Sequence, residues 1–197
     1  MTSIELENKV SSLHLQKIAF AGGCFWCTEA SFSPEYGVAE AVSGYMGGTV
    51  EGPTYEQVSS GTTGAREAVL VYFDNNVVSL KKLLVNYWTH IDPTQTNGQF
   101  HDIGSQYQTA IYYFSSEQKK VIEESKRVLE DSGKFNQPIT VEILDASKFN
   151  FYPAESYHQK YATKNPMQYS MYKKGSGRAG FIRDHWENDK TFDNFLK

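Results

Sequence analysis

Strand-like and helix-like segments alternate along the chain, and this alternation constrains the possible folds more than any other sequence feature. Residues 66–73, REAVLVYF, alternate in a period of two, which is typical of a strand. Residues 80–91 carry apolar side chains at helical spacing, which predicts an amphipathic helix packed on a sheet. The sequence therefore predicts a mixed body of strands and helices.

The remaining segments extend this pattern. Strands are predicted at KIAFA (17–21), AIYYF (110–114) and ITVEIL (139–144), and helices at residues 24–32 and 117–130. Residues 46–55 contain glycines and a proline and are expected to form an irregular loop. Residues 92–109 form a long polar loop, which we expect to be a wall of a functional site. The C-terminal part is expected to be irregular, apart from one helix after Pro153, and to wrap the body.

Length and composition are those of one globular unit. The chain has 197 residues, of which 40% are hydrophobic and 21% charged, enough for one continuous core. Residues 1–16 are polar and weakly patterned, so we expect a flexible extension followed by a single domain at 17–197.

Charge and hydropathy limit the partners. The net charge is -4 and the basic residues are scattered, so we expect no nucleic-acid partner. The sequence lacks a signal peptide and a membrane-span-length apolar run, which predicts a cytoplasmic protein with no membrane partner.

Both cysteines of the chain lie in one short stretch, AFAGGCFWCTEASF, at residues 19–32. In a reducing compartment a close cysteine pair is more often catalytic, redox-active or metal-binding than structural. Two thiols cannot complete a closed zinc site, so we expect no metal. A cysteine at a helix start is stabilised as the thiolate by the helix dipole, which makes Cys24 a candidate nucleophile.

Two interpretations stay open for Cys27. Cβ atoms one helical turn apart lie roughly 5–6 Å from each other, and a disulfide needs about 4 Å. Cys27 can therefore bond to Cys24 if the first turn relaxes. Alternatively, it is a small buried apolar residue. Phe25 and Trp26 also have two interpretations, as an apolar pocket for a methyl or thioether group or as core residues.

Glu67 lies on the same strand face as Val69, Val71 and Phe73, because side chains alternate along an extended chain. Burial raises a carboxyl pKa, so this face favours an acid that keeps its proton near neutral pH. The alternative is a salt bridge with Arg66. Neighbouring strand residues point to opposite faces, which disfavours that pairing.

An ordered series of motifs carries a resemblance to a known family. GGCFWCTEA, SGYMGG, PTYEQVSSGTTGAREAV, IDPT with GQFHDIGSQYQTAIYY, FYPAESYHQKY and GSGR occur in that order between residues 17 and 178. Together they resemble the peptide methionine sulfoxide reductases of the A type, which reduce the S epimer. The resemblance implies an α+β fold, a two-layer sandwich of a mixed or antiparallel sheet with helices, related to the ferredoxin-like arrangement. It also implies that residues 17–197 form a single catalytic domain.

The same resemblance implies residue roles. Cys24 attacks the sulfoxide sulfur, Glu67 is the acid, and Tyr55 and Tyr107 hydrogen-bond the sulfoxide oxygen. Phe25 and Trp26 line the pocket around the methyl group, and Asp102 positions the substrate main chain. For the two tyrosines the alternative is packing, and for Asp102 it is a turn beside Gly104.

The implied reaction leaves a sulfenic acid on Cys24, which a second thiol converts to a disulfide. The C-terminal tail has no cysteine, so either Cys27 or an external thiol resolves the intermediate. We expect no bound cofactor, reduction by thioredoxin, glutaredoxin or dithiothreitol, and a monomer. Expected substrates are oxidised proteins, peptides and free methionine sulfoxide.

Two other function classes are alternatives. A general CxxC thiol–disulfide oxidoreductase would use the same cysteine pair, and Pro138 before a strand is compatible with it. Cys27→Ser separates the two, since it abolishes disulfide exchange but spares one reductase turnover. An interaction module built on the tyrosine-rich tail has no support in the sequence. No role is assigned to His101, His158 or His185.

Overall fold

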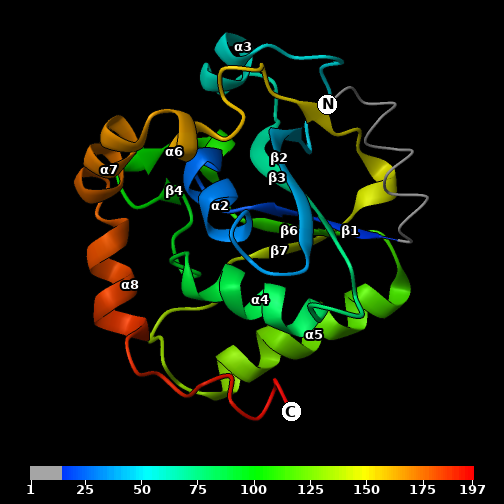
Figure 1. Cartoon of the computed structure of the whole chain (residues 1–197), viewed down its shortest axis with the longest axis vertical. Helices are drawn as coiled ribbons and strands as arrows, with labels where there is room; N and C mark the ends of the chain where they lie inside the picture. Colours follow the sequence, from blue (N-terminus) through cyan, green and yellow to red (C-terminus); the bar gives the residue numbers. More distant parts are fainter. Residues whose placement is uncertain (1–14) are drawn as a thin grey trace.

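A six-stranded sheet forms the centre of the computed structural model, which describes residues 15–197 (Figure 1). The strands are β1 (Gln16–Ala21), β2 (Val38–Met46), β3 (Arg66–Phe73), β6 (Ala110–Tyr113), β7 (Glu142–Asp145) and β8 (Tyr152–Pro153). Their order is β7-β6-β1-β3-β2-β8. All neighbours pair antiparallel except β6 and β7, which are parallel. The predicted mixed sheet is confirmed.

The predicted N-terminal extension falls mostly outside the structure. Residues 1–14 lie outside the described residues, and β1 begins at Gln16, the last residue of the predicted extension. The division into an extension and a catalytic domain stays a prediction.

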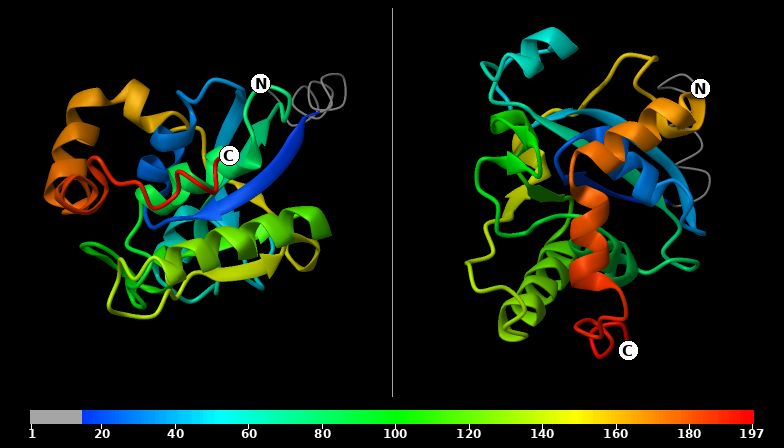
Figure 2. Two further views of the ribbon diagram at one scale, coloured as in Figure 1. Left: turned by 90° about the horizontal axis from the view of Figure 1, so that it is seen from below. Right: turned by 90° about the vertical axis from the view of Figure 1, so that its left-hand side faces the viewer.

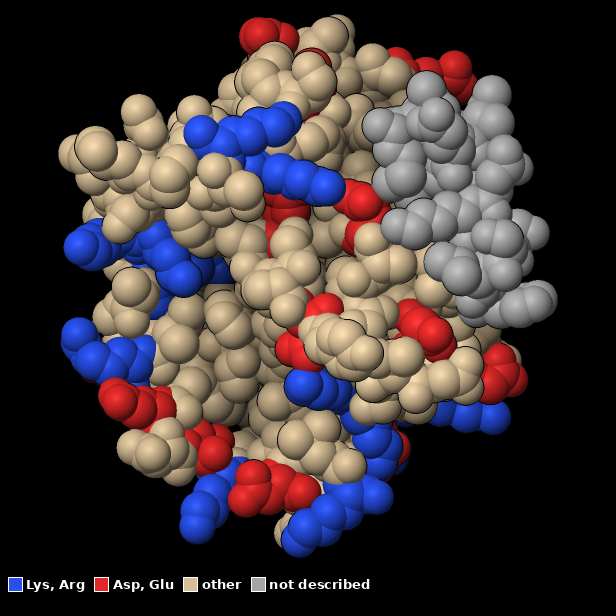
Figure 3. All heavy atoms as spheres, in the orientation of Figure 1, with Lys and Arg blue, Asp and Glu red and all other residues tan. Residues whose placement is uncertain are grey.

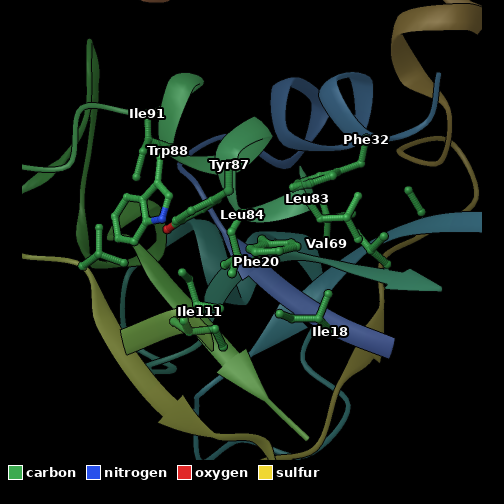
Figure 4. Packing of buried hydrophobic residues seen from close by; sticks show 14 of the residues in the cluster. Ile18, Phe20, Phe32, Val69, Leu83, Leu84, Tyr87, Trp88, Ile91 and Ile111 are labelled. Carbon is green, nitrogen blue, oxygen red and sulfur yellow. The ribbon is translucent and has the colours of Figure 1, made fainter. Parts of the chain in front are cut away.

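Three helices cover one face of the sheet: α2 (Phe25–Phe32), α4 (Leu80–Thr89) and α5 (Ser116–Asp131). Figure 4 shows sheet side chains such as Phe20 and Val69 facing Leu83 and Leu84 of α4. This core contains the apolar face of β3, as the period-two pattern predicts. Sheet and helices form the expected two-layer sandwich.

A smaller cluster closes the opposite face of the sheet. Ala19, Leu70 and Tyr112 point to that side, and Phe149 and Phe151 pack against them. Both phenylalanines belong to the connection between β7 and β8, which begins with the short 3₁₀ helix η2 (Ala146–Lys148). The sheet is therefore buried on both faces, by helices on one side and by a connecting segment on the other.

The two segments expected to be loops contain short regular elements. Helix α3 (Tyr55–Ser59) begins at the end of the glycine-rich loop, where Thr54 and Gln57 form a capping box. The 92–109 segment contains the small hairpin of β4 (Gly98–Gln99) and β5 (Asp102–Ile103), followed by the 3₁₀ helix η1 (Ser105–Tyr107). Elements this short leave no periodicity to read in the sequence.

The expectation of an irregular C-terminal segment is wrong. It contains α6 (Tyr161–Lys164), α7 (Pro166–Gly175) and α8 (Arg178–Trp186). Pro166 starts α7, and Gly177, with φ +85°, separates α7 from α8. Neither helix carries an apolar stripe, because both are polar or aromatic on several sides, and this hid them from pattern analysis.

The C-terminal helices lie beside the start of α2. Figures 1 and 2 show α6 and α7 next to α2, and α8 descending toward α4 and α5. Beyond α8, Phe192 and Phe195 enter the main core. The C-terminal segment thus returns to the body of the molecule and reaches the tip of α2 on its way.

The strand and helix succession β1, α2, β2, β3, α4, β6 is β-α-β-β-α-β if the short elements α3, β4, β5 and η1 are set aside, as in ferredoxin-like folds. The relation to that arrangement stays a prediction.

Within residues 15–197, no helix combines the length and apolar character that crossing a bilayer requires. Acidic and basic side chains are interspersed on the face in Figure 3, with several basic ones along the edge where α7 and α8 lie.

Candidate active site

Gly22 and Gly23 connect β1 to α2, and the space around them admits only glycine. Gly23 has φ +81°, and a Cβ on it would lie 2.5 Å from Cβ of Gln99. A Cβ on Gly22 would lie 2.9 Å from Oγ1 of Thr28. The glycine pair therefore lets other segments pack closely around the start of α2.

Cys24 is the N-cap residue of α2 and is 6% exposed. Its backbone oxygen accepts from the N–H groups of Cys27 and Thr28, at 3.1 and 3.3 Å. Burial raises the pKa of the Cys24 thiol well above its ordinary value, and a hydrogen bond with Cys27 and the charge of Glu67 add to this. Burial outweighs the helix-terminus effect expected from the sequence, so the resting Cys24 is a thiol.

Glu67 lies on β3 and is 2% exposed, on the apolar face that the sequence predicted. Its Oε2 accepts a hydrogen bond from the backbone N–H of Phe25 at 2.9 Å, which places the carboxyl at the N-terminus of α2. Burial raises the pKa of Glu67 to about 8. Arg66 pairs with Glu142 instead, so the salt-bridge alternative for Glu67 is not formed.

Two tyrosines flank the Glu67 carboxyl. Tyr55 starts α3, and its N–H donates to Oε1 of Glu155 at 2.9 Å. Tyr107 ends η1. Burial raises the pKa of both phenols, and in each case the charge of Glu67 is the next cause. Both hydroxyls therefore keep their protons at neutral pH and can donate to an oxygen beside Glu67.

Asp102 belongs to the β4–β5 hairpin and lies close enough to Glu67 for its charge to raise the pKa of that carboxyl further. Tyr172 of α7 donates to Oδ2 of Asp102 at 2.5 Å. The same hydroxyl also lies within reach of the Cys24 sulfur, and donation to that sulfur in place of Asp102 would lower the Cys24 pKa against the effect of burial. The C-terminal segment thus reaches two of the predicted site residues through one side chain.

Phe25 and Trp26 lie in an aromatic cluster. Phe25 is fully buried among Tyr45, Tyr55 and His158. Trp26 is half-buried and stacks on Tyr161 of α6, with ring centroids 3.7 Å apart and planes within 6°. These contacts join the wall beside Cys24 to the C-terminal segment.

His158 is a residue of this site that sequence reasoning missed. Its Nδ1 accepts from the indole Nε1–H of Trp26 at 3.1 Å, and burial lowers the pKa of the ring. A neutral imidazole that accepts at Nδ1 carries its proton on Nε2. His158 therefore fixes the orientation of Trp26. The only sequence signal was its place in the motif FYPAESYHQKY.

Cys27 is 4% exposed and faces α7 and α8. The Cys24 thiol donates to its sulfur, and this lowers the pKa of Cys27 to about 6 against the opposing effect of burial. Arg178, Tyr169 and Lys173 lower it further. Sequence reasoning missed these three residues, although GSGR, which contains Arg178, is one of the motifs in the resemblance.

The predicted site residues therefore converge on the tip of α2. A buried thiol, a protonated carboxyl and two phenols lie together, beside an aromatic wall and a second thiol. Such a set can protonate an oxygen while sulfur attacks its neighbouring atom. Within residues 15–197, no group of three or more His, Cys, Asp or Glu side chains is arranged to hold a metal ion.

Known proteins share this arrangement of sequence and fold. Residues 16–190 match the family model described as peptide methionine sulfoxide reductase. The MsrA of Bacillus licheniformis is 52% identical over 167 residues, which cover 85% of this chain and 91% of that protein. The methionine sulfoxide reductase A of Corynebacterium diphtheriae superposes with a TM-score of 0.69 at 32% identity, covering 78% of this chain and 76% of that one.

Reduced Mxr1 from Saccharomyces cerevisiae gives a TM-score of 0.71 at 30% identity, covering 78% of this chain and 87% of its own. A structure of Mxr1 with Trx2, at 21% identity and a TM-score of 0.52 over 75% of this chain and 85% of that one, supports the fold alone. The family match spans most of the chain, and the alternative of a general thiol–disulfide oxidoreductase is not favoured. The chain belongs to the peptide methionine sulfoxide reductase family and is, within it, an enzyme of the A type that reduces the S epimer of methionine sulfoxide.

Proposed function

We propose that Cys24 attacks the sulfur of methionine S-sulfoxide while Glu67 gives its proton to the oxygen. One observation carries this assignment: the Glu67 carboxyl is buried and hydrogen-bonded to the N–H of Phe25, the residue next to Cys24. A sulfoxide oxygen leaves only when it is protonated, so the acid must keep its proton near neutral pH. The raised pKa of Glu67, about 8, meets that requirement.

The surrounding side chains match the other parts of the substrate. Tyr55 and Tyr107 donate to the sulfoxide oxygen together with Glu67, as their protonated hydroxyls permit. Phe25 and Trp26 enclose the methyl group, and Asp102 accepts from the substrate main chain. Tyr172 now occupies an oxygen of Asp102, so substrate binding exchanges that hydrogen bond.

The first half-reaction balances without a cofactor. The attack forms a transient S–S bond between Cys24 and the substrate sulfur as the sulfoxide S–O bond breaks. Transfer of the oxygen to the Cys24 sulfur then breaks the S–S bond, and the products are methionine and a Cys24 sulfenic acid. Glu67 gives one proton to the oxygen, and the proton lost by the Cys24 thiol replaces it. The two-electron oxidation of Cys24 matches the two-electron reduction of the substrate.

Cys27 resolves the intermediate in this proposal. Its sulfur attacks the sulfenic sulfur of Cys24, an S–S bond forms, and the oxygen leaves as water. Two observations support Cys27 over an external thiol: its hydrogen bond with Cys24, and a lowered pKa, which apolar burial alone would not produce. The first turn of α2 relaxes as the disulfide closes.

The disulfide is then reduced by a thioredoxin-type dithiol. Support comes from yeast Mxr1, which one of its structures shows bound to Trx2. Glutaredoxin and dithiothreitol are alternative donors of the same two electrons. The enzyme repairs oxidised proteins, and free methionine sulfoxide and peptides present the same group. In this proposal the enzyme is a cytoplasmic monomer and has no nucleic-acid or membrane partner.

One experiment tests the two cysteine roles together. The reduced protein is mixed with one equivalent of methionine S-sulfoxide without reductant, and the products are identified by mass spectrometry. An intramolecular Cys24–Cys27 disulfide is expected. A sulfenic acid that persists on Cys24 would assign resolution to an external thiol. A parallel reaction is run with the R epimer. Consumption of the R epimer instead of the S epimer would contradict the geometry proposed for the pocket.

A further inference from the structure

Arg178 is a buried cation that has no carboxylate partner. It is 2% exposed, and the ion pairs formed within residues 15–197 leave it out. Its guanidinium donates to the backbone oxygens of His90 and Gly22, the latter at 2.8 Å, and lies 4.7 Å from the centroid of the Phe100 ring. A buried charge is costly unless an opposite charge lies near it. A negative charge beside Arg178 would therefore lower the free-energy cost of burying its guanidinium.

Cys27 can supply this negative charge, since the charge of Arg178 acts on its thiol. The Arg178 guanidinium sits against the glycine pair, since its Nη2 would lie 3.0 Å from a Cβ on Gly23, the residue before Cys24. Tyr169 of α7 places its hydroxyl as a hydrogen-bond donor to the Cys27 sulfur, and the charge of Cys27 acts in turn on that phenol. Cys27 therefore has a donor and a cation from two neighbouring elements.

The charged and titratable groups that act on Cys27 come from four elements. They are Cys24 at the tip of α2, Glu67 on β3, Tyr169 and Lys173 on α7, and Arg178 at the start of α8. Glu67 is the one acid among them, and it adds no negative charge while it keeps its proton. The rest donate hydrogen bonds or carry positive charge, so this environment favours an anion at Cys27.

We infer that Arg178 and Tyr169 are positioning residues that hold Cys27 as a thiolate, ready to attack the Cys24 sulfenic acid. The inference rests on the proposed resolving role of Cys27. The thiolate sulfur bonds to the Cys24 sulfur, the S–O bond breaks, and the oxygen takes a proton and leaves as water. Arg178 and Tyr169 keep their own protons throughout. The C-terminal segment thereby supplies the positive charge and the phenol donor that act on the second thiol.

The test isolates Cys27 from the chemistry at Cys24. In Cys24→Ser the serine hydroxyl can still donate to Cys27, which becomes the only thiol. Iodoacetamide alkylation is followed against pH, with mass spectrometry to confirm the site. The midpoint should lie below the ordinary thiol value of about 8.5. Adding Arg178→Gln should raise the midpoint by about one pH unit or more, and Tyr169→Phe should raise it by less.

Matched variants separate charge from structure. Arg178→Lys keeps the charge and should keep the midpoint low. Arg183→Gln lies on the exposed side of the same helix α8 and should leave the midpoint unchanged. If Arg178→Gln does not fold, the Tyr169→Phe variant tests the inference in its place, since a smaller rise of the alkylation midpoint is still expected there. An unshifted midpoint in Arg178→Gln, or in Tyr169→Phe when that variant decides, overturns the inference.

A single-turnover experiment separates this inference from the proposed function. In the parent protein, quenched samples should show a sulfenic acid followed by the disulfide, and Arg178→Gln should slow the second step about twofold or more at neutral pH, since a rise of about one unit in the Cys27 pKa from about 6 halves the thiolate fraction. A parent that forms no disulfide refutes the resolving role of Cys27. A parent that forms it, with an unchanged second step in Arg178→Gln, refutes only the role of Arg178.

Discussion

The two thiols lie three residues apart in one helix, yet their surroundings differ. Cys24 lies beside Glu67, which is buried on β3 and keeps its proton, although Tyr172 of α7 also reaches its sulfur. Cys27 faces the C-terminal helices, where Arg178 and Tyr169 favour a negative charge. Burial raises the pKa of Cys24, while the pKa of Cys27 falls to about 6.

This difference shows how one short helix serves two steps. The sheet side provides proton transfer to a leaving oxygen, which needs a neutral acid. The C-terminal side provides a second nucleophile, which needs an anionic sulfur. Strand β3 positions Glu67, and the short helices α3 and η1 position the two tyrosines. The C-terminal helices α7 and α8 position Tyr169 and Arg178. Variants on either side should therefore affect different steps.

The largest effect is expected from the two cysteines. Cys24→Ser should reduce turnover of the S epimer to background, because it removes the thiol proposed to attack sulfur beside the Glu67 carboxyl. Cys27→Ser should still release one equivalent of methionine and then stop with thioredoxin as the reductant. Methionine per enzyme, measured by chromatography, distinguishes them. Full turnover in Cys24→Ser would contradict the assignment of different roles to Cys24 and Cys27.

Removing the acid is expected to be the next largest effect. Glu67→Gln keeps an acceptor for the Phe25 N–H but has no proton to give, so kcat should fall by about 10²–10⁴-fold. In the parent, kcat should decline as the pH rises through about 8, where Glu67 loses its proton. The variant should lack this decline. Stopped assays with dithiothreitol across the pH range measure both effects.

The same substitution should stabilise the fold. A carboxyl with a raised folded pKa stabilises fully only below its unfolded value of about 4.3, and this contribution is lost as the pH rises through about 8. A tenfold change in the acid dissociation constant on folding corresponds to about 1.4 kcal/mol. At pH 7, which lies about 2.7 units above the unfolded pKa and below the folded one, Glu67→Gln should be more stable by about 3–4 kcal/mol. Urea unfolding should show this gain, and show it disappearing in acid.

The hydrogen bond between Tyr172 and Asp102 should have the smallest effect. Tyr172→Phe removes a donor to a carboxylate and frees Asp102 for the substrate main chain. A hydrogen bond to a charged group is worth about 1.5–3 kcal/mol, but substrate replaces this one, so KM should change only about threefold. Initial rates with a methionine sulfoxide peptide test it. A loss as large as that of Glu67→Gln would place Tyr172 in the chemistry.

The two sides of α2 were not equally readable from the sequence. The alternation in β3 placed Glu67 on the apolar face, and the helical spacing in α4 identified the layer that buries it. The place of Cys24 at the helix start predicted a lowered pKa and a thiolate. Its burial raises the pKa instead, and this burial cannot be read from the local sequence. Such burial arises from segments far apart in the chain.

The C-terminal side was hidden for a physical reason. Helices α7 and α8 pack through aromatic and charged side chains on several faces, so they show no periodic apolar stripe. Arg178 contacts Gly22 across 156 residues, and His158 contacts Trp26 across 132. Only the motif resemblance marked GSGR and SYHQKY, and it assigned neither residue a role.

The central claim is that Glu67 keeps its proton at neutral pH beside the reacting sulfur. Difference infrared spectroscopy of Cys24→Ser with bound methionine S-sulfoxide, referenced to the same protein carrying Glu67→Gln, reports the protonation state of that carboxyl directly. The account predicts a carboxylic-acid carbonyl band at neutral pH that disappears as the pH rises through about 8. A carboxylate band at neutral pH, with no acid band, would contradict it.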